Sequence, residues 1–516
     1  MRTTFSILIL LISLTTLAQN KYAEEWQQID SLTAQGKSQS ALEHIIRIYD
    51  QAKAANQADQ FVKASLCRMA VESSFQEDYY EKNIQRTLSE IQTAKAPVKQ
   101  ILHSIVAELY WKYYQQHRWE IGQRSVTSNF LPDDLKTWDL RKIVAACMDN
   151  YASALTEKEL LKTTPLSAYT EILIKQEESE KFRPTLFDFL AHRAIDFYSS
   201  SDAGLTKPAE SFLVDQPAYF AAVTQFATQA ISSPDAFSFE FQSIKLFQEV
   251  LRLHQNDADP TALIDADLER LSFVHQKSTL PEKDSLYMKA LTRLENQFQN
   301  HSSSTEIAYK IALQLSADDQ QPTHYRNKNA AVTDIPEGSK WNKKKAIEIC
   351  EAAIRRFPDS FGANNCRSLI EQIKQPSLSI TTEYASIAGK PSRVLVNYQN
   401  ISKVYFRLLK IDYEENREIL ENDRNIRLGK YRDKKAELSW EQELPDDGDC
   451  RGIGARNGRK AENDQEEYRG LDDDMSERDL EPCRPVPGKG GIDGGDQRGA
   501  GSERPGQPDE EAQYQR

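Results

Sequence analysis

Several motifs that would identify an enzyme or a cofactor site are missing from this 516-residue sequence. It contains no G-x-x-x-x-G-K-[ST] phosphate loop, no H-E-x-x-H zinc motif and no G-x-S-x-G nucleophile turn. It also contains no C-x-x-C pair, which argues against zinc ribbons and thioredoxin-like redox sites. We therefore predict that the protein is not an enzyme and has no catalytic residues, no cofactor and no metal site.

An excess of positive charge is also missing. The chain has 65 Lys+Arg against 78 Asp+Glu, which gives a formal net charge of -13. A surface that neutralises phosphates needs the opposite balance, so we predict no nucleic-acid partner. No stretch after the first residues is apolar enough to cross a membrane, so we predict no membrane span in the mature chain.

The N-terminus has the pattern of a secretory signal peptide over residues 1–19. Arg2 supplies the positive charge, Phe5–Leu17 is the apolar segment, and cleavage is predicted near Ala18 and Gln19. The apolar segment is too short to cross a hydrocarbon layer of about 30 Å. An N-terminal anchor helix remains the alternative. We expect an exported protein that is periplasmic, exposed on the outer surface or secreted.

Residues 20–375 have the periodicity of paired helices. Trp26, Ile29 and Leu32 lie at helical spacing before Gly36, and a second apolar stripe follows over residues 41–49. The same pattern recurs along the region, and "AIEICEAAIRRFPDSFGANN" is typical of the second helix of a tetratricopeptide (TPR) unit and the turn after it. The sequence predicts a mainly α fold, a TPR-like solenoid of helical hairpins that presents an extended surface.

Cysteine is scarce, with six residues in the chain. Cys350 and Cys366 lie on opposite sides of the turn near Pro358, at similar heights in a helical hairpin. Export permits disulfides, so we predict a disulfide between these two cysteines. Two buried free thiols are the alternative.

One histidine lies in an aromatic-rich helical segment, "FRPTLFDFLAHRAIDFY". His192 has apolar neighbours there and is followed by Arg193. A single histidine in such surroundings is more often a structural residue than a ligand or a base, and we interpret His192 in that way.

The periodicity changes from 3.6 to 2 near Pro376. Alternating β-branched and aromatic residues are centred on Ile380, Val396 and Phe406, and a further strand region is expected within Tyr431–Leu444. The pattern predicts the start of an antiparallel β-sandwich over residues 376–449. A sandwich of this kind needs about seven strands, and about four are recognisable, so we predict an incomplete domain.

Residues 450–516 differ in composition from the rest of the chain. They contain 12 of its 20 glycines, their only aromatic residues are Tyr468 and Tyr514, and apolar periodicity is lost. We interpret this segment as a disordered or artefactual tail, out of frame from Cys450 onward because of a frameshift or an error in the gene model. A genuine disordered tail is the alternative.

Residues 20–449 resemble the N-terminal part of the large bacterial alpha-2-macroglobulin-like proteins. The stretches that carry the resemblance are "YAEEWQQIDSLTAQGKSQSALE", "ILHSIVAELYWKYYQQHRW", "DDLKTWDLRKIV", "RPTLFDFLAHRAIDFY", "AIEICEAAIRRFPDSFGANNCRSLIEQI" and "SLSITTEYASIAGKPSRVLVNYQNISKVYFRLLKID". The resemblance implies an exported protease trap with a helical N-terminal region and a series of macroglobulin-type sandwiches. In many members a Cys-Gly-Glu-Gln thioester captures the protease covalently.

The chain departs from that family pattern. None of its cysteines is followed by Gly-Glu-Gln, and the bait and thioester regions that the family implies are not recognisable. We therefore expect an N-terminal fragment of an endopeptidase inhibitor that is not inhibitory by itself, with proteases as partners of the full-length protein only. The alternative is an exported TPR-like scaffold that binds a peptide or an envelope protein. The coding sequence downstream of codon 449 distinguishes the two.

Overall fold

The structure is a computed structural model of the whole chain. It describes residues 22–124, 134–173, 179–200, 211–235, 237–317, 341–382, 394–410, 431–432, 434–445, 448, 450 and the backbone of 453–457. The predicted signal peptide with Ala18 and Gln19, and residues 458–516 of the predicted tail, lie outside the described residues.

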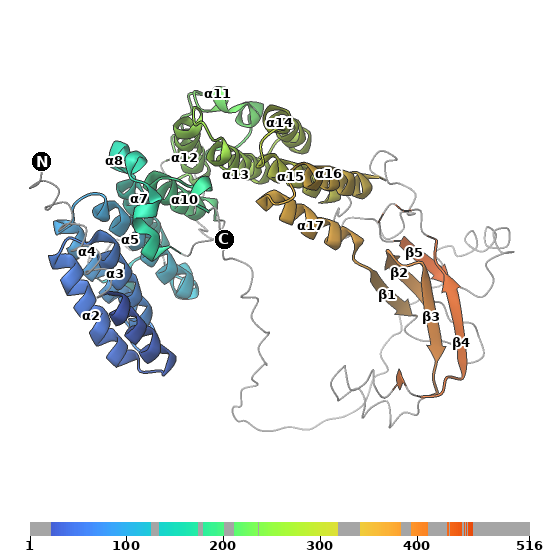
Figure 1. The fold of residues 1–516 in the computed structure, drawn as a ribbon, viewed down its shortest axis with the longest axis horizontal. Helices are drawn as coiled ribbons and strands as arrows, with labels where there is room; N and C mark the ends of the chain where they lie inside the picture. Colours follow the sequence, from blue (N-terminus) through green and yellow to red (C-terminus); the bar gives the residue numbers. More distant parts are fainter. Residues whose placement is uncertain are drawn as a thin grey trace, which may run out of the picture. The chain divides into compact units, whose positions relative to one another are not determined.

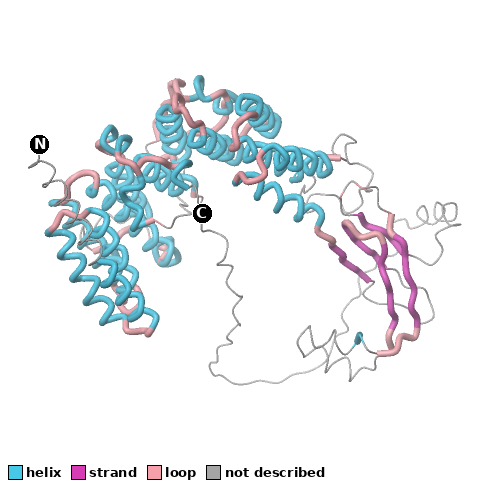
Figure 2. The backbone as a smooth tube through the Cα atoms, viewed as in Figure 1, coloured by secondary structure: helices cyan, strands magenta, loops and turns pink. Residues whose placement is uncertain are grey.

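Helices make up nearly all of the described chain up to residue 374 (Figures 1 and 2). A helix over residues 22–34 comes first. The helices that follow are α2 (Ser38–Ala54), α3 (Ala58–Glu72), α4 (Tyr79–Thr93), α5 (Val98–Gln116), α6 (Arg118–Gly122), η1 (Leu135–Thr137), α7 (Leu140–Ala154), α8 (Lys158–Thr163), η2 (Leu166–Ile172), α9 (Ser179–Phe182), α10 (Leu186–Ser199), η3 (Pro217–Phe220), α11 (Val223–Phe226), α12 (Phe239–His254), α13 (Thr261–Lys277), α14 (Lys283–Phe298), α15 (Ser304–Ala317), α16 (Asn342–Arg356) and α17 (Phe361–Lys374).

Helices that are consecutive in the sequence pack against one another as hairpins. The pairs α2 with α3, α4 with α5, α12 with α13 and α16 with α17 are in contact. Gly36 ends the first helix at a φ of +72°, a left-handed conformation that glycine adopts without strain, as the sequence predicted. Ser238 and Ser360 cap the N-termini of α12 and α17 by accepting hydrogen bonds from backbone N–H groups.

Two groups of buried side chains hold the helices together. The larger group runs from Tyr22 to Ile311 and is rich in aromatic and branched residues. The smaller group joins α15, α16 and α17 and consists mostly of alanine and cysteine, with Ile347, Leu369 and Ile373. The apolar stripes read from the sequence face these cores, because a helix with one apolar face is stable only when that face is covered.

Strands replace helices after Lys374. The strands are β1 (Ser377–Thr382), β2 (Val394–Gln399), β3 (Lys403–Leu408), β4 (Leu438–Glu443) and β5 (Ile453–Asn457). The first four lie where the sequence pattern predicted strands. The sequence did not predict β5, which lies in the segment expected to be without structure. A mainly α fold with small sheets is therefore confirmed.

The strands form two small sheets, one of them a hairpin of β3 and β4. One sheet has the order β1-β2-β5, and the other pairs β3 with β4. The β3–β4 pair is antiparallel, with Phe406 opposite Trp440 and the two rings stacked 4.9 Å apart. Lys403 Nζ lies 2.6 Å from an oxygen of Glu443, the residue opposite it. These cross-strand pairs fix the register of the two strands.

The chain divides into two compact units. One comprises Met1–Ser379 and Asn397–Ile453, and it contains all the helices named above together with β3 and β4. The other comprises Ile380–Val396 and Gly454–Arg516, of which only 380–382, 394–396 and the backbone of 454–457 are described.

Candidate functional site

Helix α10 begins with a capping box that also belongs to a buried network of charges. The backbone N–H of Thr185 donates to Asp188 Oδ2 (2.9 Å), and the N–H of Asp188 donates to Thr185 Oγ1 (3.3 Å). The other carboxylate oxygen of Asp188 lies 2.8 Å from His254 Nε2, and His254 Nδ1 lies 2.6 Å from Asp257. Because ionised carboxylates only accept hydrogen bonds, both ring nitrogens donate and the ring is an imidazolium.

The pKa values of this network agree with a charged pair. Burial opposes the charge of His254, but its hydrogen bonds to Asp188 and Asp257 raise its pKa above the usual value of 6.5. Burial likewise opposes the charge of Asp188, but the hydrogen bond from His254 lowers its pKa. All the hydrogen-bonding capacity of the His254 ring is used, which makes this network a structural one.

His192 lies one helical turn after Asp188 and has a different environment. Its side chain is buried, with the residue 1% exposed. Its Nδ1 lies 2.7 Å from the backbone carbonyl oxygen of Asp188, and a carbonyl can only accept, so Nδ1 carries a proton. Its Nε2 lies 3.1 Å from Glu269 Oε2, within ion-pair distance, and no described residue meets the geometry of a hydrogen bond to this buried nitrogen.

Helix α13 brings two carboxylates to this nitrogen. Asp265 and Glu269 are four residues apart and therefore share one face of α13. One ligand atom from each of His192, Asp265 and Glu269 lies within 4.8 Å of the other two. Both carboxylate residues are partly exposed, so the cluster is open to solvent on their side while the imidazole is buried. We refer to these three residues as the His192 cluster.

Positive charges around the His192 cluster balance only some of its acids. Arg183 Nη2 lies 3.8 Å from Glu269 Oε2. Burial opposes the charge of Glu269, but His192, Arg183 and Lys310 together lower its pKa. Burial, reinforced by the negative charge of Glu269, raises the pKa of Asp265. Positive charge therefore compensates the carboxylate of Glu269 better than that of Asp265.

The histidine of the cluster also has a shifted pKa. Burial opposes the charge of His192, but Glu269 raises its pKa.

A second buried charge on α13 contrasts with the His192 cluster. Arg270 is fully buried, and its guanidinium donates to Asp267 Oδ1 through Nε (2.9 Å) and through Nη2 (2.5 Å). It also donates to the carbonyls of Tyr219 (2.6 Å) and Ala221 (3.1 Å), and it lies over the ring of Phe226. This ion pair is closed, because neighbouring groups occupy its donors and water is excluded.

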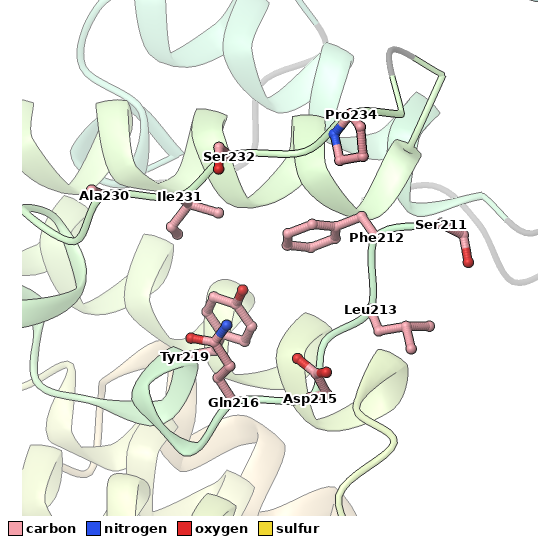
Figure 3. Close-up of a pocket in the computed structure, with 10 residues that line it drawn as sticks. All are labelled: Ser211, Phe212, Leu213, Asp215, Gln216, Tyr219, Ala230, Ile231, Ser232 and Pro234. Atoms are coloured by element: carbon pink, nitrogen blue, oxygen red, sulfur yellow. The ribbon is translucent and has the colours of Figure 1, made fainter. Parts of the chain in front are cut away.

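A pocket of about 400 Å³ lies between residues 211–219 and residues 230–234. Figure 3 shows the rings of Phe212 and Tyr219 and the side chain of Ile231 directed into it, whereas Leu213 points away. Among the described residues that line it, Asp215 and Tyr219 are ionisable. The lining thus mixes aromatic and aliphatic side chains with polar ones, and it offers a contact surface.

The two cysteines predicted to form a disulfide are neighbours. Cys350 on α16 and Cys366 on α17 are both buried free thiols in the same small core, and the Cys366 thiol donates to the carbonyl oxygen of Thr305 (3.8 Å). The neighbouring thiol of Cys350, and burial, raise the pKa of Cys366. The sequence predicted that these two cysteines are close together, and in the structure they are neighbours in one core. The disulfide itself stays a prediction.

Sequence reasoning singled out His192 but not its partners. Asp265 and Glu269 lie in "IDADLERL", where acids four residues apart are typical of a solvent-facing helix surface. One signal could have found them. They alternate with Ile264, Ala266 and Leu268, which are all buried, so most faces of α13 are packed against other helices. Only the tertiary structure, which brings α10 and α13 together, identifies the partner of His192.

Among the helices that the structure describes, none combines the length and apolar character needed to cross a membrane. Comparison of the chain with models of protein families, with curated proteins and with solved structures gives no match.

Proposed function

We propose that the chain is the N-terminal part of an exported alpha-2-macroglobulin-like endopeptidase inhibitor. In this proposal the helices form a TPR-like, non-catalytic scaffold, and the strands after Lys374 begin a macroglobulin-type sandwich. The chain has no Cys-Gly-Glu-Gln sequence, so we expect it not to capture a protease covalently. Proteases would be partners of the full-length inhibitor.

The observation that carries the proposal is the apolar surface of the β3–β4 hairpin. Leu408, Trp440 and Leu438 share one face of the hairpin and are 57%, 43% and 39% exposed, whereas Tyr405, 71% exposed, lies on the other face. A two-stranded hairpin is marginally stable alone and needs further strands, or another layer, to cover such a face. These strands therefore have the character of one edge of a larger β domain.

The helix-to-strand change supports the same proposal. Helix α17 ends at Lys374 and β1 begins at Ser377. Gln399 and Asn400 donate side-chain hydrogen bonds to the carbonyl of Ile373 (3.1 and 2.8 Å), which joins the end of the last helix to the turn between β2 and β3. The sequence resemblance implies this order, a helical region followed by a first sandwich.

The first test is the coding sequence beyond codon 449. We expect a second reading frame to continue with alternating strands, and peptide mass mapping of the natural protein to find peptides from that frame. Peptides from the printed residues 450–516, with no longer product, would overturn the inhibitor proposal.

A functional test compares the printed chain with the protein from the extended frame. After incubation with trypsin, an inhibitor of this kind protects a protein substrate while small peptide substrates are still hydrolysed. We expect this protection from the extended protein and none from the printed chain. Equal cleavage of the protein substrate in all samples would contradict the proposal.

A scaffold that binds a peptide or an envelope protein is the second candidate function. It is favoured by the pocket with Phe212 and Tyr219 and by the exposed Leu213 beside it (47% exposed). Crosslinking in the cell envelope would test it. A partner lost in Phe212→Asp but retained in Leu160→Asp, an exposed residue on α8, would support the scaffold, and equal crosslinking of both variants would exclude this pocket.

A further inference from the structure

We propose that the His192 cluster is a binding site for a divalent metal ion of the zinc class. The ligands would be His192 Nε2 from α10 and one carboxylate oxygen each from Asp265 and Glu269 on α13. This site goes beyond the scaffold role, and it revises the interpretation of His192 as a purely structural residue and the prediction of no metal site.

The first observation is the hydrogen bond that Nδ1 of the imidazole ring donates. Nδ1 donates its proton to the carbonyl oxygen of Asp188 at 2.7 Å. In the neutral ring this bond leaves a lone pair on Nε2, pointing toward α13. Histidines that bind metals almost always donate their other ring N–H to a carbonyl or a carboxylate, which fixes the tautomer and the orientation of the ring.

The second observation is the burial of Nε2. The residue is 1% exposed, and among the described residues this nitrogen has an ion-pair neighbour, Glu269, but no hydrogen-bond partner. A buried polar atom without a partner costs free energy, and nearly all such atoms in folded proteins are satisfied. Elsewhere in this molecule, both nitrogens of the buried His254 have partners. An ion coordinated by Nε2 would satisfy the nitrogen of His192.

The two carboxylates supply the remaining ligands and the route of entry. They share a face of α13, and the ligand atoms of the three residues lie within 4.8 Å of one another. Ligands bound at about 2.1 Å around tetrahedral zinc are about 3.4 Å apart, so no pair of ligand atoms needs to close by more than about 1.4 Å. The partial exposure of Asp265 and Glu269 leaves one side of the ion for a water ligand.

Two positive charges compete with a metal ion for the ligands of the His192 cluster. Arg183 competes with a metal for Glu269, since its guanidinium lies 3.8 Å from that carboxylate. The occupant that competes most directly is a proton on His192 Nε2, which would make an ion pair with Glu269 and leave no metal site.

The experiment is a zinc titration of the full chain after removal of metals with a chelator. We expect one equivalent of Zn²⁺ by calorimetry and a rise in melting temperature with added Zn²⁺. His192→Gln and Glu269→Gln each should weaken Zn²⁺ binding at least tenfold, and Asp265→Asn should weaken it as well. The matched control is His275→Gln. His275 is on α13, the helix that carries the two carboxylates, and its Nε2 pairs with Asp284 at 2.6 Å, outside the His192 cluster.

Two further readouts distinguish zinc held by the His192 cluster from misfolding of a variant and from zinc held by cysteines. Circular dichroism shows whether each variant keeps its helices, so that misfolding is not mistaken for loss of binding. X-ray absorption of the zinc-loaded chain should show nitrogen and oxygen ligands only. A sulfur shell at about 2.3 Å would assign the zinc to cysteines and overturn the proposal. Absence of binding at millimolar Zn²⁺, or binding unchanged in His192→Gln, would also overturn it.

Discussion

Two cores of this molecule are built from different side chains. The first lies around α10, α12 and α13, and the second lies around α15, α16 and α17. The first contains aromatic residues and buried charges, among them Asp188, His254 and Arg270. The second consists mainly of small residues, among them Ala308, Ala346, Ala353, Ala363, Cys350 and Cys366. Large side chains separate helices and leave room for polar groups that need partners. Small side chains bring helix backbones close together and leave no room for such polar groups.

This difference shows where chemistry can arise in a helical scaffold. Charged side chains among large residues form either closed pairs, such as Asp267 with Arg270, or open clusters, such as His192 with Glu269 and Asp265. The open cluster lies in the first core because the spacing there admits an imidazole and two carboxylates. The second core tolerates little change, and the reactive groups within it are two adjacent thiols.

The largest effect is expected from breaking the closed pair in the first core. Arg270→Leu leaves Asp267 buried without its partner and removes the donors to the carbonyls of Tyr219 and Ala221. Removing one member of a buried pair destabilises a protein by about 3–5 kcal/mol, and we expect a loss in this range from denaturant unfolding. Arg355→Leu, at an exposed ion pair, is the control and should change stability by less than about 0.5 kcal/mol.

The double variant Asp267→Asn, Arg270→Leu sharpens this first test. It leaves no uncompensated charge, so it should recover part of the lost stability. A loss below about 1 kcal/mol in the single variant would mean that water reaches Asp267, and that the pair is not closed.

The second core should respond to oxidation. Peptide mapping without reductant should find a disulfide between Cys350 and Cys366 in the exported protein. Closing a loop of roughly 15 residues stabilises a protein by about 3 kcal/mol, so reduction should lower the free energy of unfolding by that amount. The Cys350→Ser, Cys366→Ser variant should be insensitive to reductant. Alkylation of both thiols without prior reduction would show that the disulfide is not formed.

A smaller effect is expected from enlarging one residue in the second core. A Cβ on Gly362 would lie 2.3 Å from the backbone N of Glu306 and 2.5 Å from the backbone carbonyl carbon of Thr305. Gly362→Ala must therefore separate α15 from α17, and we expect a loss of about 1–3 kcal/mol. Gly122→Ala is the matched control, because a Cβ there meets nothing within 4 Å. Equal thermal unfolding of both variants would show that the helices are not so closely packed.

The smallest effect concerns the pH dependence of the first core. The pKa of His254 in the folded protein lies above the usual 6.5, so its contribution to stability is fully present below pH 6.5 and is lost as the pH rises through the raised pKa. Asp257→Asn removes the more exposed of its two acidic partners. We expect a loss of less than about 1 kcal/mol at pH 6 and a shallower decline above pH 6.5.

Denaturant unfolding at a series of pH values measures this effect. Glu249→Gln, which removes the partner of Lys158, is the control and should leave the pH profile of the wild type unchanged between pH 6 and 9. An identical decline in Asp257→Asn and the wild type would show that Asp257 does not help to hold the charge on His254.

Periodicity in the sequence was enough to locate most of the secondary structure. The apolar stripes around Ile105, Leu291 and Ile311 lie on α5, α14 and α15, and the alternating residues around Ile380, Val396 and Phe406 lie on strands. Such patterns are local, since each element must bury one face whatever its partner is. The strand β5 was missed because its sequence, "IGARN", has little alternation and gains its order by pairing with another strand.

What the sequence alone determined is the kind of element at each place, the turn at Gly36, the pairing of Cys350 with Cys366 as neighbours, and the change from helix to strand after Lys374. The tertiary structure decided which polar side chains meet. Asp265 and Glu269 reach His192 across about 70 residues of chain, because α10 and α13 belong to the same core. Charges of this kind interact through space over a few ångströms, and no local pattern records the partner that packing will bring to them.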